Sequence, residues 1–285
     1  MKVMQLLDDL DVKARRHGGR VISLLGNHEI YNCIGHMKYV SPESLASWGY
    51  VEEARVRDFR PGGVQACRLA ATRAAYVIVG SYLFTHAGFT SSSMHKLGIT
   101  SRASLDALNR KAQDWLYGTH QYRDDEEEEE EEEKEKEDAE EHKRQTKKKK
   151  KKKKKKTKMD EDGNEIERLL SERVLGTLPS DGFLDQETPT ADADPVAKLS
   201  KRCRSVLGEV LTTLGLKGIV IGHTIQEDGI ITSGCRGRVF RVDFGGSRAF
   251  DEFRDEPGTR PPPQVLEIID DAVIRRLVGV SKKKK

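Results

Sequence analysis

Three short stretches of the sequence carry residue types that can bind a metal or transfer a proton. Residues 26–29 read Gly-Asn-His-Glu, residues 86–88 read His-Ala-Gly, and residues 222–224 read Gly-His-Thr. Imidazole nitrogens are common ligands of divalent transition metals. A single histidine of this kind is more often structural than a ligand, but three in similar settings favour a shared metal site.

Each of these stretches follows a segment that is typical of a buried strand. Residues 21–25, 76–84 and 216–221 are rich in apolar residues, are of strand length and lead into a small residue and a histidine. A layered α/β fold places the ends of such strands along one edge of its sheets. The alternative for residues 26–29 is an ordinary polar turn after a buried strand. Because this arrangement occurs three times, we favour a functional site over an ordinary turn.

The sequence around these stretches resembles a known family. Residues 83–88 read Leu-Phe-Thr-His-Ala-Gly, residues 221–226 read Ile-Gly-His-Thr-Ile-Gln, residues 241–247 read Arg-Val-Asp-Phe-Gly-Gly-Ser and residues 264–268 read Gln-Val-Leu-Glu-Ile. In this order, after Gly-Asn-His-Glu, they resemble the metallophosphoesterases, and within the phosphoprotein phosphatases the Shewanella-like protein phosphatases. The resemblance implies an α/β fold, a four-layer αββα sandwich, and hydrolysis of phosphate monoesters by a metal-activated hydroxide.

The same resemblance implies a role for each candidate residue. Asn27, His86 and His223 would ligate one of two divalent metal ions, and manganese, iron or zinc suits these nitrogen and oxygen ligands. His28 would be the general acid that protonates the departing oxygen. Glu29 is expected to be structural, and Asp243 either faces the site or ends a strand. The expected substrate is a phosphoprotein, with a leaning towards phosphotyrosine, and no substrate-binding residue is identified.

Two further motifs of the family, Gly-Asp-x-His-Gly and Gly-Asp-x-x-Asp-Arg-Gly, are not in this sequence. They precede a helix that resembles the one expected at the start of this chain. We therefore expect a fold that lacks its first β-α-β portion, as in an N-terminally truncated member, with impaired catalysis. Two alternatives stay open: a catalytically silent, phosphatase-like binding protein, and a diadenosine polyphosphate hydrolase.

Composition divides the chain into segments. Residues 1–122 and 166–280 read as two parts of one metallophosphoesterase domain, and residues 281–285 as a basic tail. Between the two parts, residues 124–141 are almost wholly acidic, and residues 147–156 are all lysine. A segment of this kind, residues 123–165, has almost no apolar side chains to bury and is expected to be a disordered insertion. Nucleic-acid contact through the lysine run is an alternative that rests on charge alone.

The absence of a long apolar run and the spacing of the cysteines bear on the location of the protein. The 285 residues carry a formal charge of +3 and no apolar run of about 18 residues, so no contact with a membrane is expected. The four cysteines form no CxxC pair and fit reduced thiols better than disulfides: Cys33, Cys67, Cys203 and Cys235. This favours an intracellular, cytoplasmic protein, while a nuclear or organellar location stays open.

Local patterns predict the remaining elements. Helices are expected at the N-terminus, after Ser41, and over residues 64–75, 101–115 and 197–214. Residues 76–84 are expected to form one strand that presents His86. Strands at residues 230–232, 239–244, 265–269 and 272–278 are expected to form a closing antiparallel sheet. His36 stands where the family pattern has an aspartate, and we read it as a solvated loop residue.

Overall fold

The computed structural model describes residues 2–119, 163–178, 180, 186–187, 196, 198–247 and 260–279. Most of the predicted insertion, the tail at residues 281–285 and the segment 181–185 lie outside this range. Residues 163–165, which we assigned to the insertion, begin a helix that continues to residue 170. The chain forms two compact units, residues 1–74 with 107–168 and residues 75–106 with 169–285.

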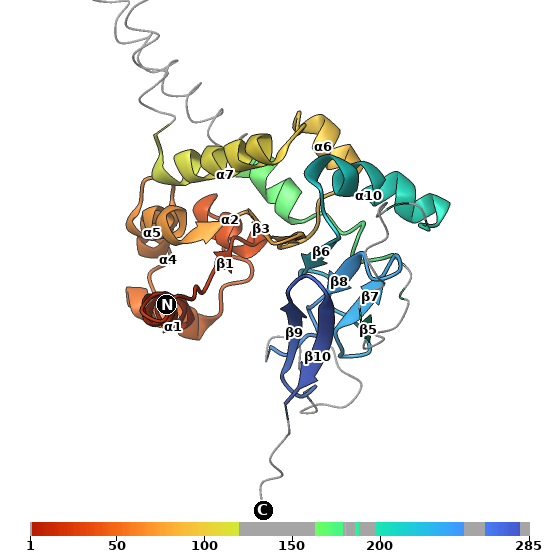
Figure 1. Ribbon diagram of the computed structural model, residues 1–285. Helices are drawn as coiled ribbons and strands as arrows, with labels where there is room; N and C mark the ends of the chain where they lie inside the picture. Colours follow the sequence, from red (N-terminus) through yellow and green to blue (C-terminus); the bar gives the residue numbers. More distant parts are fainter. Residues whose placement is uncertain are drawn as a thin grey trace, which may run out of the picture. The chain divides into compact units, whose positions relative to one another are not determined.

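The first unit is mainly helical (Figure 1). Its two short strands pair in parallel, with Ser23 beside Arg73 and Leu24 beside Ala74. Along the chain its elements are α1 (Lys2–Arg15), β1 (Ser23–Leu24), α2 (Asn27–Cys33), α3 (Pro42–Leu45), η1 (Ala46–Trp48), α4 (Glu52–Phe59), α5 (Val64–Thr72), β2 (Arg73–Ala74) and the greater part of α7 (Arg102–Tyr117).

Side-chain bonds set the ends of these elements. Ser41 caps α3, because its hydroxyl accepts the backbone N–H of Ser44 at 3.2 Å. Asp11 of α1 accepts the backbone N–H of Val21 at 2.9 Å and binds Arg15 and Arg20, which ties the helix to the approach to β1. The helix predicted after Ser41 is therefore present.

The second unit is built on two sheets. A five-stranded mixed sheet has the order β3-β4-β6-β8-β7, and a three-stranded antiparallel sheet has the order β5-β10-β9. Its elements are β3 (Tyr76–Val79), β4 (Tyr82–Thr85), α6 (Ser91–Lys96), β5 (Gln186–Glu187), α10 (Lys201–Leu214), β6 (Gly218–Ile221), β7 (Thr232–Gly234), β8 (Val239–Arg241), β9 (Gln264–Ile269) and β10 (Val273–Val278) (Figure 1).

The two sheets pack against each other through apolar side chains. Tyr82, Val220 and Phe240 of the larger sheet form one buried cluster with Ile274 of β10, and Leu266 and Ile268 of β9 pack on it. Burying such side chains stabilises the unit by roughly 25 cal/mol for each Å² removed from water. The sheet core is thus shared by strands up to about 190 residues apart in sequence.

Two strand predictions were wrong. Residues 76–84 form an antiparallel pair, β3 and β4, because the chain reverses at Gly80 and Ser81. Gly80 has φ +58, and the Ser81 hydroxyl donates to Asp271 at 2.8 Å. The predicted closing sheet is also divided: β7 and β8 belong to the mixed sheet, and β9 and β10 form the hairpin of the smaller one.

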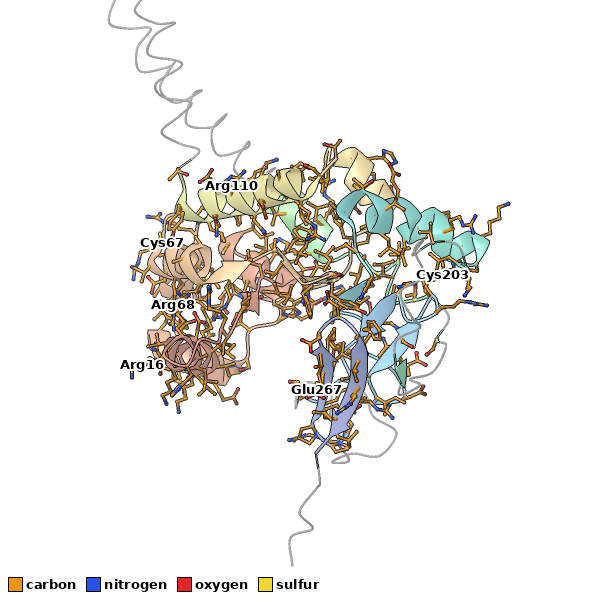
Figure 2. The ribbon with its side chains drawn as sticks, viewed as in Figure 1. Arg16, Cys67, Arg68, Arg110, Cys203 and Glu267 are labelled. Carbon is orange, nitrogen blue, oxygen red and sulfur yellow. A yellow bond between two sulfur atoms is a disulfide. The ribbon has the colours of Figure 1, made fainter. Side chains whose placement is uncertain are left out.

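The prediction of four free thiols was also wrong. Cys203 in the first turn of α10 and Cys235 after β7 form a disulfide, with a Cα–Cα distance of 5.7 Å; Figure 2 labels Cys203 on its helix. Cys33 and Cys67 are free. The two bonded cysteines are 32 residues apart, a separation at which sequence spacing alone does not indicate pairing. The cysteines therefore do not support a reducing compartment.

None of the helices in the described residues has the length and apolar character that crossing a bilayer requires.

Candidate functional site

His86 and His223 lie together at the ends of two neighbouring parallel strands. The β4–β6 ladder runs from Tyr82 beside Gly218 to Thr85 beside Ile221. His86 follows the ladder by one residue and His223 by two, because Gly222 intervenes. Parallel strands end at the same edge of a sheet, so the two imidazoles meet there.

The two rings are in contact. His86 Nε2 lies 3.1 Å from His223 Nδ1, and the ring centroids are 5.0 Å apart at an interplanar angle of 65°. The backbone fixes this pair: Gly222 N–H donates to the His86 carbonyl at 2.8 Å, and His223 has φ 62, in the left-handed region. Both residues are partly buried, and the two nitrogens are within hydrogen-bonding distance, so one ring carries the proton that the other accepts.

Gly176 supports this pair in a way that sequence reasoning missed. A Cβ built at Gly176 would lie 2.2 Å from Thr224 Oγ1, so only glycine leaves room for the residue that follows His223. Leu175, its neighbour, packs close to Gly88, two residues after His86. In the sequence, Gly176 is an isolated glycine outside every recognised motif, so nothing there indicated its role.

The other predicted site residues open helix α2 in the first unit. Asn27 is buried, with 5% of its surface exposed, whereas His28 is exposed. Glu29 accepts the backbone N–H of Gly26 at 2.8 Å, which caps the helix. Burial raises the pKa of the Glu29 carboxyl, while the Gly26 N–H opposes that rise. Glu29 thus has a structural bond, in agreement with its predicted role.

Arg55 of α4 anchors the same helix. Its guanidinium stacks between Trp48 and Phe59, 4.6 and 4.8 Å from their ring centroids, and is 7% exposed. Its Nε donates to Asn32 Oδ1 of α2 at 2.8 Å, and a second nitrogen donates to Ser44 Oγ at 3.2 Å. Burial lowers the pKa of Arg55. No sequence pattern marked this residue.

Aromatic rings surround His28. Its ring centroid is 4.9 Å from that of Tyr39 and 5.8 Å from that of Tyr31. Tyr31 stacks in turn on His36 at 5.8 Å and 20°, and on Tyr39 at 5.8 Å and 24°. We call Tyr31, His36 and Tyr39 the ring shelf. His36 is exposed, as predicted, but it is part of this cluster.

Two more residues have structural partners. Asp243, after β8, accepts the backbone N–H of Gly245 at 3.1 Å, and its carbonyl accepts the N–H of Gln226. Arg241 is 2% exposed and donates to the carbonyls of Leu178 and Ser233, so it is shielded from any substrate in solution.

The structure brings the predicted residues together in two sets, one in each unit. His86 and His223 form a contacting pair in the second unit, and Asn27 and His28 are adjacent in the first. Within the described residues, no three histidine, cysteine, aspartate or glutamate side chains cluster closely enough to hold a metal ion. The ligand set of Asn27, His86 and His223 stays a prediction.

Comparison with known proteins finds distant relatives. No family model matches the chain. Uncharacterized protein R398 of Acanthamoeba polyphaga mimivirus is 28% identical over 95% of this chain and 97% of its own length. Shewanella-like protein phosphatase 2 of Arabidopsis thaliana is 21% identical over 96% of this chain. The chain spans only 63% of that plant relative.

A solved structure has a similar fold. The cold-active protein-tyrosine phosphatase of a psychrophilic Shewanella species superposes with a TM-score of 0.51 at 18% identity, over 86% of this chain and 55% of its own. At that identity the likeness shows a shared mixed α/β fold. The plant relative makes the chain similar, at low identity, to a Shewanella-like protein phosphatase.

Proposed function

We propose that this chain is a metal-dependent phosphoprotein phosphatase that hydrolyses phosphate monoesters. The observation that carries the proposal is the His86–His223 pair, two imidazoles 3.1 Å apart at the ends of adjacent parallel strands. The distant homology to phosphatases supports the class. The four-layer αββα arrangement and the phosphoprotein substrate are parts of this proposal.

The proposed ligands carry donor atoms of the kinds that divalent metals bind. His86 and His223 would hold the metal through ring nitrogens, and Asn27 through its amide oxygen, a combination that suits manganese, iron or zinc. A bound ion of this kind supplies hydroxide at neutral pH and neutralises charge on the phosphoryl oxygens. The positive φ of His223 and the Gly222 hydrogen bond hold the second imidazole against the first.

His28 would protonate the oxygen of the leaving group. It is exposed, so a substrate in solution can reach it, and it follows Asn27 directly on α2. Glu29 bonds the start of this short helix, and Arg55 bonds Asn32 near its end, so the backbone that carries His28 is held at both ends. A general acid of this kind contributes about 100-fold or more to the rate.

The test measures Mn²⁺ binding and hydrolysis of p-nitrophenyl phosphate by the chain. We expect slow, Mn²⁺-dependent turnover that His86→Gln and His223→Gln each lower at least about tenfold, with weaker Mn²⁺ binding. His28→Gln should lower turnover about 100-fold and leave Mn²⁺ affinity nearly unchanged. The matched control is His17→Gln, an exposed histidine in the turn after α1.

Two outcomes would contradict the proposal. Turnover that needs no metal, or that persists after both His86 and His223 are substituted, would contradict metal-dependent hydrolysis at this pair. Mn²⁺ binding that depends on the pair but is accompanied by no hydrolysis of any phosphomonoester would favour the silent binding protein.

A further inference from the structure

Glu172 joins the loop that follows His86 to a segment far along the chain. Its Oε1 accepts the Thr90 hydroxyl at 3.1 Å, and its Oε2 accepts the Ser93 hydroxyl. The two hydroxyl oxygens lie 3.0 Å apart, and their residues are 3% and 7% exposed. Hydrogen bonds to a carboxylate are stronger than those between neutral groups, so this cluster ties Glu172 firmly to the His86 side of the candidate site.

The hydroxyl cluster also fixes the backbone between His86 and α6. Thr90, four residues after His86, caps the helix by accepting the Ser93 N–H at 3.2 Å. Ser91 donates to the Val206 carbonyl of α10 at 3.1 Å. The loop that carries the first histidine is therefore bonded to the carboxylate on one side and to α10 on another.

The segment that bears this carboxylate continues to the second histidine of the pair. Leu175 packs against Gly88, where an added Cβ would lie 3.2 Å from the leucine side chain. Gly176 meets Thr224 in the turn of the second histidine, where an added Cβ would lie 2.2 Å from the threonine Oγ1. We call residues 172–176 the brace, because they contact the loops of both histidines within one compact unit.

The charge of Glu172 also acts at the strand end that presents His86. Burial raises the pKa of Tyr76, and the negative charge of Glu172 adds to that rise. Tyr76 lies on β3 beside Thr85, the residue before His86. A carboxylate among buried side chains is costly unless donors bond its oxygens, and the two hydroxyls do so. A glutamine would replace one acceptor oxygen by an N–H donor group, so one hydroxyl would lose its bond.

We infer that Glu172 is a positioning residue for the histidine pair. It holds the brace against the loop of His86, and the brace in turn supports the turn of His223 through Gly176. The contact between the two rings therefore depends on a carboxylate that acts through hydroxyl groups and a glycine. The inference rests on the proposed function only in taking the pair as metal ligands, and it adds the residue that sets their spacing.

The first measurement is nuclear magnetic resonance of the metal-free chain with ¹⁵N-labelled histidine. The proton between His86 Nε2 and His223 Nδ1 should give a ring N–H resonance that exchanges slowly with water, because the pair is hydrogen-bonded and partly buried. In Glu172→Gln we expect this proton to exchange at least about tenfold faster. In Glu227→Gln, which removes an exposed carboxylate shortly after Thr224, the exchange rate should be unchanged.

The second measurement is Mn²⁺ binding by calorimetry. Glu172→Gln should weaken Mn²⁺ affinity about tenfold, as expected when a group that orients a metal ligand is lost. Ser93→Ala should act in the same direction, and the double variant should bind no more weakly than Glu172→Gln, because both changes remove one bond. Glu227→Gln should keep the affinity of the unmodified chain. Thermal melting checks folding, and Ser93→Ala alone carries the comparison if Glu172→Gln does not fold.

The inference would be overturned by a slowly exchanging ring N–H that persists in Glu172→Gln, or by its absence from the unmodified chain. Additive losses of Mn²⁺ affinity in the double variant, or an equal loss in Glu227→Gln, would also overturn it. Failure of the proposed function is distinguishable, because the metal-free measurement involves neither Mn²⁺ nor a phosphate ester. If turnover is absent while the ring N–H responds to Glu172→Gln and not to Glu227→Gln, the positioning role stands and the phosphatase proposal does not.

Discussion

At the scale of single residues, Arg55 anchors helix α2 through partners that carry no charge. In the described part of the chain, Arg55 binds neutral groups: the amide oxygen of Asn32, the hydroxyl of Ser44 and two aromatic faces. A buried guanidinium is stable in such a setting because its planar fork satisfies several acceptors while its faces stack on rings. Lysine has neither property.

We therefore predict that Arg55→Lys lowers the free energy of unfolding by about 2 kcal/mol. The ammonium loses the stacking contacts with Trp48 and Phe59 and cannot reproduce the hydrogen bond to Asn32. Urea unfolding measures the change. Arg57→Lys, at an exposed position of the same helix, should change it by less than about 0.5 kcal/mol. Equal stability of the two variants would show that the stack contributes nothing.

At the scale of elements, α1 is joined to the approach to β1 by Asp11. The Arg15 hydrogen bond, followed by the Val21 N–H and Arg20, lowers the pKa of the Asp11 carboxyl to about 2. A carboxyl with a folded pKa below its unfolded value stabilises the folded state above pH 4. It loses that contribution as the pH falls from about 4 to about 2.

Asp11→Asn should therefore lower the urea midpoint at pH 7 and have a much smaller effect at pH 2, where the Asp11 carboxyl of the folded, unmodified chain is about half protonated. The measurement is urea unfolding of both proteins at several pH values between 7 and 2. Asp106→Asn, an exposed aspartate of α7, is the control for loss of a charge. An effect of Asp11→Asn that is as large at pH 2 as at pH 7 would show that the ion pairs are not its cause.

The turn that carries His223 depends on the segment that follows the helix of residues 163–170. Gly176→Ala would place a Cβ 2.2 Å from Thr224 Oγ1, so Thr224 must move and His223 with it. We expect a loss of about 1 to 3 kcal/mol of stability, together with weaker Mn²⁺ binding. Gly19→Ala, where the nearest atom is 3.5 Å away, should leave both unchanged. Unchanged Mn²⁺ affinity in Gly176→Ala would show that the contact between Gly176 and Thr224 does not position the histidine pair.

At the scale of the whole molecule, the Cys203–Cys235 disulfide closes a loop that includes α10, β6 and His223. Closing a loop of about 32 residues lowers the entropy of the unfolded chain. The bond therefore stabilises the part of the second unit that presents one of the two histidines.

The double substitution Cys203→Ser/Cys235→Ser should lower the free energy of unfolding by about 3 to 4 kcal/mol. Unfolding of the unmodified chain should become easier in dithiothreitol, and that of the variant should not respond. Cys67→Ser, which changes a free cysteine, is the control. Four reactive thiols in the unmodified chain, counted in denaturant without a reductant, would show that the disulfide does not form.

Much of the local structure could be predicted because its signals lie within short windows. Ser41 next to Pro42 indicated the start of α3, and the apolar spacing of residues 101–115 indicated α7. The histidines at the ends of buried strands were recognisable for the same reason. The phosphatase resemblance rested on these stretches, and the comparisons confirmed it at low identity.

The sequence by itself determined the helices α1, α5, α7 and α10 and the histidines that follow β4 and β6, because capping, periodicity and strand length act between near neighbours. Only the tertiary structure decided the cysteine pairing, the reversal at Gly80, the division of the C-terminal strands between two sheets and the neighbours of Arg55. Each of these depends on contacts between residues far apart along the chain or on a steric fit in space. Local sequence patterns do not indicate such contacts, because the contacts are stabilised by the burial of side chains in the folded unit.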